Sequence, residues 1–154
     1  VFRHSSIYGG RQFSSIDQGW IGWFINEYIR FNNDEINEIN IQGDGKQVRD
    51  ILFIDDLVNF FKKIIEKDFS NLTQNYFNVG GGINNSISII ELLDFLSDYF
   101  KSSKEINIRT NEWRKGDQKF YVSNLDTIHK NFDWLPSIDM KEGIVKYLNW
   151  IKNG

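Results

Sequence analysis

Apolar residues recur along this chain with two different spacings, and each spacing predicts a different kind of element. Over residues 17–31 the apolar side chains fall three to four positions apart, which is typical of an amphipathic helix. Shorter apolar runs predict strands, and these lie at residues 1–4, 39–41, 48–54 and 76–79, with further extended pieces at 106–108 and 120–122. The chain is therefore expected to mix short strands with helices.

Capping side chains mark where the remaining helices begin. Helices ending near residues 67, 132 and 151 are expected to start at Asp55 or Asp56, at Asn124 and at Asp139. The S-x-x-E string of residues 88–91 has the form of a capping box and predicts a helix to about residue 100. These elements predict an α/β fold, a small mixed lobe forming one domain over residues 1–154, with too few strands for a complete doubly wound sheet.

Composition excludes several classes of protein. The net charge of −3 lacks the basic bias of a nucleic-acid-binding surface. The absence of cysteine excludes disulfides and thiolate chemistry and fits a cytoplasmic location. No apolar stretch reaches the roughly 20 residues of a membrane span. Aromatic residues make up 16% of the chain, so most of them are expected in the core.

Gly80 and Gly82 invite comparison with a dinucleotide-binding loop, because they follow a predicted strand and precede a helix. The third glycine of the G-x-G-x-x-G pattern would fall at Asn85, and the helix is expected to begin only at Ser88. A plain connection between strand and helix is the better interpretation. The chain therefore carries no complete nicotinamide-binding fingerprint.

Three motifs, in order, carry a resemblance to a known family. They are RHSSIYGGRQF at residues 3–13, QGDGKQVRD at 42–50 with two aspartates at 55–56, and RKGD at 114–117 with Tyr121. In this order and spacing the whole chain resembles the C-terminal part of an extended short-chain dehydrogenase/reductase acting on nucleotide sugars. YFNVGG at residues 76–81 and the capping box also fit that family.

Within this family the chain is most similar to the branch that epimerises C2 of CDP-sugars. SSIYGGRQF is followed by DQGWIGWF at residues 17–24, and Gly10 stands where most relatives have proline. The resemblance implies a CDP-sugar or another nucleotide sugar as ligand and NAD as cofactor. It also implies that NAD is held mainly by an N-terminal Rossmann domain, which residues 1–13 would leave as a strand end and loop.

Other functions on the same scaffold stay open. The chain could instead belong to a sugar-nucleotide 4-epimerase or 4,6-dehydratase, because one fold supports all of these reactions. It could also be a nucleotide-sugar-binding module without catalysis, or a purely structural domain. The exposed face expected where the cofactor domain would dock favours self-association.

The resemblance assigns roles to residues of the first motif and to Arg49. Ser5 and Ser6 occupy positions that face the nicotinamide and the substrate. Arg11 and Gln12 lie in the loop that grips the substrate, although both could equally support the turn. Arg49 matches an arginine that binds the nucleotide diphosphate, for which a guanidinium fork is suited; its alternative is an ion pair with a neighbouring aspartate.

The later motifs supply the other expected ligands. Gln42 would line the nucleobase pocket or support its turn. Arg114 would contact the diphosphate and Asp117 a ribose hydroxyl or the arginine itself, and the alternative for both is a surface charge cluster. Tyr121 would lie near the phosphates and the sugar, or else in the core. Trp20 and Trp23 could line the sugar site, but their helical spacing favours packing.

No catalytic residue is expected in this chain. The family's base is the tyrosine of a Tyr-x-x-x-Lys pair, but Ser103 stands four residues after Tyr99 and Ile151 four residues after Tyr147. His4 and His129 are far apart in sequence and lack neighbouring ligands, so no metal site is predicted. The chain alone is expected to bind substrate and not to turn it over.

Overall fold

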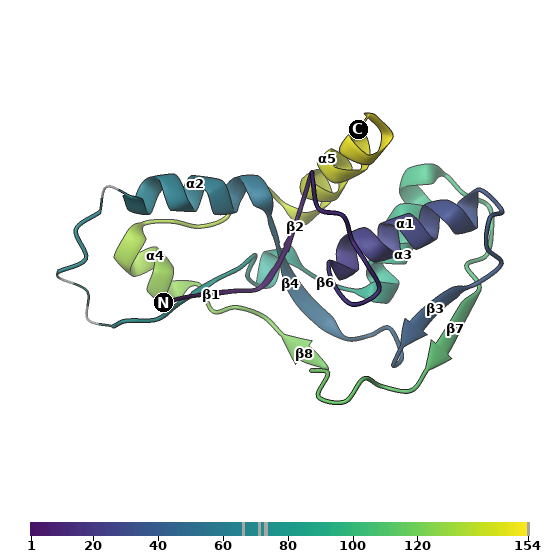
Figure 1. Cartoon of the computed structure of the whole chain (residues 1–154), viewed down its shortest axis with the longest axis horizontal. Coiled ribbons are helices and arrows are strands. Elements are labelled where there is room, and N and C mark those ends of the chain that lie inside the picture. The colour runs from purple at the N-terminus through teal and green to yellow at the C-terminus, as the bar shows by residue number, and fades with distance from the viewer. Residues whose placement is uncertain (66, 71, 73, 154) are drawn as a thin grey trace. The chain divides into compact units, whose positions relative to one another are not determined.

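The computed structural model describes residues 1–65, 67–70, 72 and 74–153. Its helices are α1 (Trp20–Asn32), α2 (Ile54–Ile65), α3 (Ile89–Phe100), α4 (Asp126–Phe132) and α5 (Met140–Asn153), with a short 3-10 turn η1 at Ile83–Asn85. Its strands are β1 (Phe2–His4), β2 (Ser6–Tyr8), β3 (Ile39–Gln42), β4 (Val48–Phe53), β5 (Phe77–Val79), β6 (Ser86–Ser88), β7 (Ile108–Asn111) and β8 (Phe120–Tyr121) (Figure 1). This is the mixed α/β fold expected from the sequence.

The chain forms two compact units, each assembled from separate stretches of sequence. Unit 1 comprises residues 1–12, 49–86 and 122–154, and unit 2 comprises residues 13–48 and 87–121. The chain enters unit 2 at Phe13, the last residue of the first motif. It returns to unit 1 at Arg49 within β4.

Unit 1 is built on short parallel strands. In β1 and β5, Phe2 is level with Phe77 and His4 with Val79. In β2 and β4, Ser6 is level with Ile51, and β6 lies on the other side of β4. Parallel strands require a crossover, and the long sequence separation between each pair provides it.

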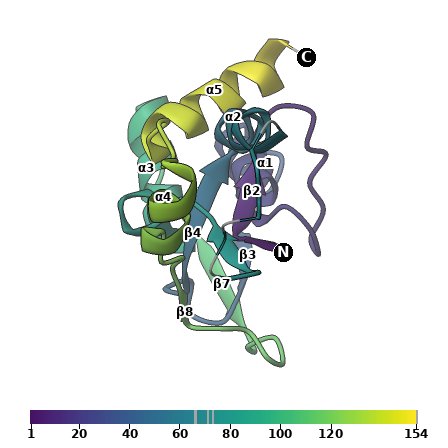
Figure 2. The same cartoon turned by 90° about the vertical axis from the view of Figure 1, so that its left-hand side faces the viewer.

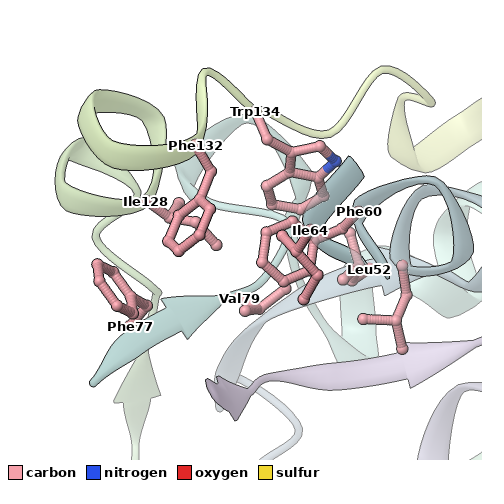
Figure 3. Close-up of a cluster of buried hydrophobic side chains, with 9 residues drawn as sticks. Leu52, Phe60, Ile64, Phe77, Val79, Ile128, Phe132 and Trp134 are labelled. Carbon is pink, nitrogen blue, oxygen red and sulfur yellow. The ribbon is translucent and has the colours of Figure 1, made fainter. Parts of the chain in front are cut away.

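An apolar cluster beside these strands forms the core of unit 1. It contains Leu52, Leu57, Phe60, Ile64, Phe77, Val79, Ile128, Phe132 and Trp134. Figure 3 shows Phe132 and Trp134 packing with Phe60 of α2 and with the β5 side chains. Phe60 and Phe132 make the most aromatic contacts here, and the Phe60 ring centroid is 4.9 Å from that of Trp134 and 5.7 Å from that of Phe132.

Unit 2 pairs β3 with β7 and covers them with helices. The two strands are parallel and in register from Ile39 with Ile108 to Gln42 with Asn111, and Figures 1 and 2 both show them side by side. Helix α1 packs against α3 and β3. Tyr28 of α1 is fully buried, with its ring 5.7 Å from that of Phe100.

Several sequence-based boundaries are wrong in detail. Strands β2 and β6 were not expected, and the extended piece predicted at 106–108 is instead β7, beginning at Ile108. Lys67 lies outside α2, and residue 66 is outside the described residues. Asn124 does not cap α4 directly, but its Oδ1 accepts a hydrogen bond from the Asp126 N–H at 2.8 Å. Asp139 caps α5 as expected, accepting the Glu142 N–H at 2.9 Å.

Asp55 and Asp56 are not caps, because α2 already begins at Ile54. Asp56 is buried and anchors the segment before α5. Its Oδ1 accepts hydrogen bonds from the N–H and hydroxyl of Ser137, and its Oδ2 accepts one from the Ile138 N–H at 2.9 Å. A tertiary role of this kind leaves no periodic signal in the sequence.

The capping box at α3 is present as expected, and it makes a prediction about stability. Ser88 Oγ accepts the Glu91 N–H, while the Glu91 carboxylate accepts from the Ser88 N–H at 2.8 Å and from the Ser88 hydroxyl. Replacing Ser88 with alanine should lower the free energy of unfolding by about 1 kcal/mol. Urea denaturation at neutral pH measures this loss.

The same pair gives a pH dependence with a definite sign. The hydrogen bonds from Ser88 hold the pKa of Glu91 below its ordinary value. The stabilisation is therefore present above the ordinary glutamate pKa and is lost as pH falls through the lowered one. Ser88→Ala should lose stability less steeply in this acidic window than the unmodified chain; parallel curves would contradict the assignment.

Candidate functional site

Residues expected to contact ligands lie in both units. Unit 1 contains Ser5, Ser6, Arg11, Gln12 and Arg49, and unit 2 contains Gln42, Arg114, Asp117 and Tyr121.

Ser5 and Ser6 lie where the chain passes from β1 to β2. The Ser5 N–H donates to the Val79 carbonyl at 3.0 Å, which fixes the backbone at the end of β5. The Ser5 hydroxyl is buried and has no hydrogen-bond partner among the described residues. Ser6 begins β2, directly beside β4. Hydroxyls at a strand end can both donate and accept, which suits a ligand with hydroxyl or amide groups.

A buried polar cluster lies next to Ser5, and the sequence did not reveal it. It comprises the side chains of Ser5, Asp50 and Ser123 around Gly80. Asp50 is 0% exposed, and its Oδ2 accepts the Gly82 N–H at 3.0 Å. A buried carboxylate needs such donors because it has lost its water. Asp50 thus connects β4 to the turn after β5.

The glycines at 80–82 serve close packing around this cluster. A Cβ on Gly80 would lie 2.2 Å from Asp50 Oδ2 and 2.4 Å from Ser123 Oγ. Gly82 has a φ of 70°, a value that side chains disfavour. These constraints explain the triple glycine without a dinucleotide, in agreement with the interpretation of Gly80 and Gly82 as a connection.

Arg11 and Gln12 occupy the turn after β2. Arg11 is exposed, with a φ of 67°. The Gln12 amide donates to the Ile7 carbonyl at 3.1 Å, and the Gln12 carbonyl accepts from the Tyr147 hydroxyl at 2.9 Å. The geometry of Gln12 is therefore that of a residue supporting the turn, while Arg11 projects from it. Tyr147 packs on this turn from α5.

Arg49 is the second residue of β4 and is partly buried. Because side chains alternate along a strand, Arg49 and Asp50 project to opposite faces of β4. Asp50 faces the buried cluster, so Arg49 lies on the face away from it. Ser6 on β2 pairs with Ile51, two residues beyond Arg49 on the same strand. Ser6 on β2 and Arg49 on β4 thus lie on two paired, parallel strands.

In unit 2 Gln42 ends β3, and hydrogen bonds hold the turn that follows it. The Gln47 amide donates to the Gln42 carbonyl at 2.8 Å, and the Gly43 N–H donates to the Asn111 carbonyl at 3.0 Å. Gly43 and Gly45 have φ values of 79° and 75°. Gln47 is buried and was missed in the sequence, where a polar residue beside a turn suggests exposure.

Arg114 and Asp117 form a tight turn beyond the end of β7. The Asp117 N–H donates to the Arg114 carbonyl at 3.1 Å, and Gly116 has a φ of 81°. The Arg114 guanidinium donates to the Ile16 carbonyl at 2.8 Å and lies 3.8 Å from the Asp17 carboxylate. Tyr121 follows in β8 and is partly buried.

Gln42 is the last residue of β3, and Arg114 lies beyond the end of β7; the final residues of these two parallel strands are in register. Ligands of parallel α/β sheets commonly bind at this edge. Among the described residues no group of three or more His, Cys, Asp or Glu side chains could hold a metal ion. No helix within the described part of the chain is long and apolar enough to cross a membrane.

Comparison with known proteins defines the class. The chain is 38% identical to CDP-paratose 2-epimerase from Salmonella typhi over 97% of its length. It is 31% identical to CDP-abequose synthase from Salmonella typhimurium; the match covers 68% of this chain and 34% of the synthase. The crystal structure of UDP-glucose 4-epimerase from Thermotoga maritima with UDP-glucose superposes with a TM-score of 0.80, at 25% identity over 99% of this chain and 45% of that one.

These similarities identify an extended short-chain dehydrogenase/reductase of the sugar-nucleotide epimerase and dehydratase type. More particularly, the chain belongs to the family described as GDP-mannose 4,6 dehydratase, whose model matches residues 1–147. The chain spans 44% of the length of the CDP-paratose 2-epimerase. The resemblance carried by the three motifs is thereby confirmed at the level of the family.

Proposed function

We propose that this chain is the nucleotide-sugar-binding part of an NAD-dependent epimerase that converts CDP-paratose to CDP-tyvelose at C2. The 38% identity to CDP-paratose 2-epimerase over nearly the whole chain carries the choice of reaction. The position of Gln42 and Arg114 at the carboxyl edge of β3 and β7 supports nucleotide binding.

Unit 2 would bind the nucleotide. Gln42 would face the nucleobase, Asp117 a ribose hydroxyl, and Arg114 the diphosphate, with Tyr121 near the phosphates. The guanidinium of Arg114 already donates to a carbonyl oxygen, which shows that its geometry suits oxygen acceptors. A diphosphate is a stronger acceptor than a backbone carbonyl, so ligand binding would compete with the contact to Ile16.

Unit 1 would contribute Ser6 and Arg11 to the sugar, Arg49 to the diphosphate and Ser5 to the nicotinamide. Gln12 would act mainly by shaping the Arg11 turn. The Ser5 hydroxyl fits an amide-bearing ring, because it lacks a protein partner and can donate or accept. Ser5 would help to hold the nicotinamide of NAD, which when bound would supply reversible hydride transfer.

The residues of this chain would therefore orient the sugar and would not move its proton. Binding energy taken at the diphosphate, remote from C2, is useful if it positions the reacting carbon. The chain has no Tyr-x-x-x-Lys sequence. We accordingly expect no conversion of CDP-paratose by the isolated chain with NAD; measurable turnover would show that the catalytic groups have been misassigned.

Calorimetric titration with CDP, UDP and dTDP tests the binding function. We expect saturable CDP binding that weakens at least tenfold in Arg49→Ala, because a guanidinium–phosphate pair is lost. Arg109→Ala is the matched control, since Arg109 pairs with Glu38 at 3.3 Å on an exposed strand and has no proposed ligand. Equal loss in both variants would indicate a general charge effect.

The choice of nucleotide also separates the proposed reaction from its rival. The Thermotoga maritima structure contains UDP-glucose, and its similarity favours a sugar-nucleotide 4-epimerase as the second candidate. Preference for UDP over CDP would support that candidate. Absence of saturable binding by any of the three nucleotides would contradict nucleotide-sugar binding by this chain.

A further inference from the structure

The indole of Trp113 lies flat on the turn that carries Gln42. A Cβ on Gly43 would lie 2.8 Å from both Cδ2 and Cε2 of this indole, the two atoms shared by its rings. The centre of one indole face is therefore against the Gly43 backbone. Only glycine permits this approach, and its φ of 79° also disfavours any side chain.

Hydrogen bonds on both sides of Gly43 hold the backbone against which this ring packs. The Gly43 N–H donates to the Asn111 carbonyl, which joins the ends of β3 and β7 two residues before Trp113. The Gln47 amide holds the Gln42 carbonyl on the other side of the same glycine. The indole thus rests on backbone that two hydrogen bonds hold in place.

One side of the indole lies against Gly43, and part of the ring is still exposed to solvent. Trp113 is 38% exposed, although a tryptophan contributes most to stability when its faces are covered. The Lys119 ammonium lies over the ring, 5.6 Å from its centroid, and Lys119 is itself exposed. A lysine at that distance makes a weak and replaceable contact.

The neighbours of Trp113 match the parts of a nucleotide. Gln42 directly precedes Gly43 in sequence and has an amide suited to the polar edge of a base, and Arg114 directly follows Trp113 with a guanidinium suited to phosphate. A flat aromatic surface next to these two residues in the chain is what a base would stack on. Packing on Gly43 alone would not require a tryptophan, because an aliphatic side chain could cover the same backbone.

We infer that Trp113 is the platform on which the nucleobase of the ligand stacks, with the base displacing Lys119 from the open face. This inference rests on the proposed nucleotide-sugar function and adds to it the residue that binds the base. Stacking on an indole depends on the π-face of the base and contributes affinity for any pyrimidine. Selection between cytosine and uracil is then left to the amide of Gln42.

The test compares a ligand that has a base with one that lacks it. Calorimetry is performed on the full 154-residue chain with CDP and with inorganic pyrophosphate, for the unmodified protein, Trp113→Leu and Trp113→Phe. We expect Trp113→Leu to weaken CDP binding roughly tenfold to a hundredfold, as for loss of one stacked base. Trp113→Phe should keep most of the affinity, and pyrophosphate binding should not change.

Phe120→Leu is the matched control, because Phe120 is another exposed aromatic residue of unit 2 and is assigned no ligand. Its CDP affinity should equal that of the unmodified chain. Circular dichroism and urea midpoints establish that each variant is folded, and Trp113→Phe keeps the test valid if the leucine variant unfolds.

Three results would overturn the inference. CDP binding by Trp113→Leu with unchanged affinity would remove Trp113 from the site while leaving the proposed function intact. An equal loss of CDP affinity and pyrophosphate affinity in Trp113→Leu and Trp113→Phe would show that Trp113 supports the fold of the turn and does not stack. Failure of the unmodified chain to bind CDP, UDP or dTDP would overturn the proposed function itself, together with this inference.

Discussion

Replacing Phe60 with alanine is expected to lower the free energy of unfolding by about 3–5 kcal/mol, as for other buried phenylalanines. Phe60 is 0% exposed and lies in the middle of the apolar cluster of unit 1. Its ring centroid is 4.9 Å from that of Trp134 and 5.1 Å from that of Phe2, which come from distant parts of the sequence. Alanine would leave a cavity that these large, rigid rings could fill only in part.

Phe61 offers a matched control on the same helix. It is 39% exposed, so Phe61→Ala removes the same atoms from a site that is already in contact with water. Urea denaturation followed by circular dichroism gives both changes, and the loss for Phe60 should be several times larger. Because small domains are stable by only about 5–15 kcal/mol, Phe60→Ala should also shift the thermal midpoint strongly. Similar losses would mean that Phe60 is not the centre of the core.

The fold could be predicted where a local pattern determined the element. The 3.6-residue period revealed α1, and the S-x-x-E string revealed the cap of α3, because both depend on neighbours in sequence. Strands β2 and β6, each of only three residues, escaped detection, and pairing with β4 holds them. β1 and β5 are equally short but lie within predicted strands at residues 1–4 and 76–79, whereas the serines of β2 and β6 leave no apolar run to mark them.

Residues of the candidate site that belong to family motifs could be predicted from the sequence, but buried residues that hold its backbone could not. Ser6, Arg49 and Arg114 could be proposed because family motifs mark them. Asp50 and Gln47 could not, because their importance comes from burial and from hydrogen bonds to backbone distant in sequence or across a turn. Trp113 looked like an ordinary aromatic residue beside an RKGD string, and only its contact with Gly43 distinguishes it.

Division of the chain into two units is the other feature that local patterns do not contain. Both units take residues from either side of β4, and two of the four crossing points lie inside elements, at residues 48–49 in β4 and at 86–87 in β6. A composition shift or a linker would normally mark such a boundary. Here the strand itself continues from one unit to the next, so no linker is needed.

Replacing Gly81 with alanine should lower the free energy of unfolding about as much as Phe60→Ala does. The cause is overpacking by an added atom, whereas Phe60→Ala leaves a cavity. A Cβ on Gly81 would lie 2.1 Å from the Ile51 carbonyl oxygen and 2.7 Å from Asn85 Cβ. Both Ile51 and its neighbours in β4 are held by pairing with β2 and β6, so the backbone cannot move aside cheaply. We expect a loss of about 3 kcal/mol or more in the free energy of unfolding, at the upper end for overpacking.

Gly116→Ala separates this steric effect from the conformational preference of glycine. Nothing lies within 4 Å of a Cβ at Gly116, but its φ of 81° is disfavoured for alanine, so a loss of about 1–2 kcal/mol is expected. Urea denaturation of both variants gives the comparison, and a smaller loss for Gly81→Ala than for Gly116→Ala would contradict the packing described for β4.

Since Ile51 lies two residues beyond Arg49, a displaced β4 should also weaken CDP binding in folded Gly81→Ala, whereas Phe60→Ala should leave the affinity of its folded fraction unchanged. The joint loss of stability and affinity would therefore connect the triple glycine to the proposed diphosphate site through one strand.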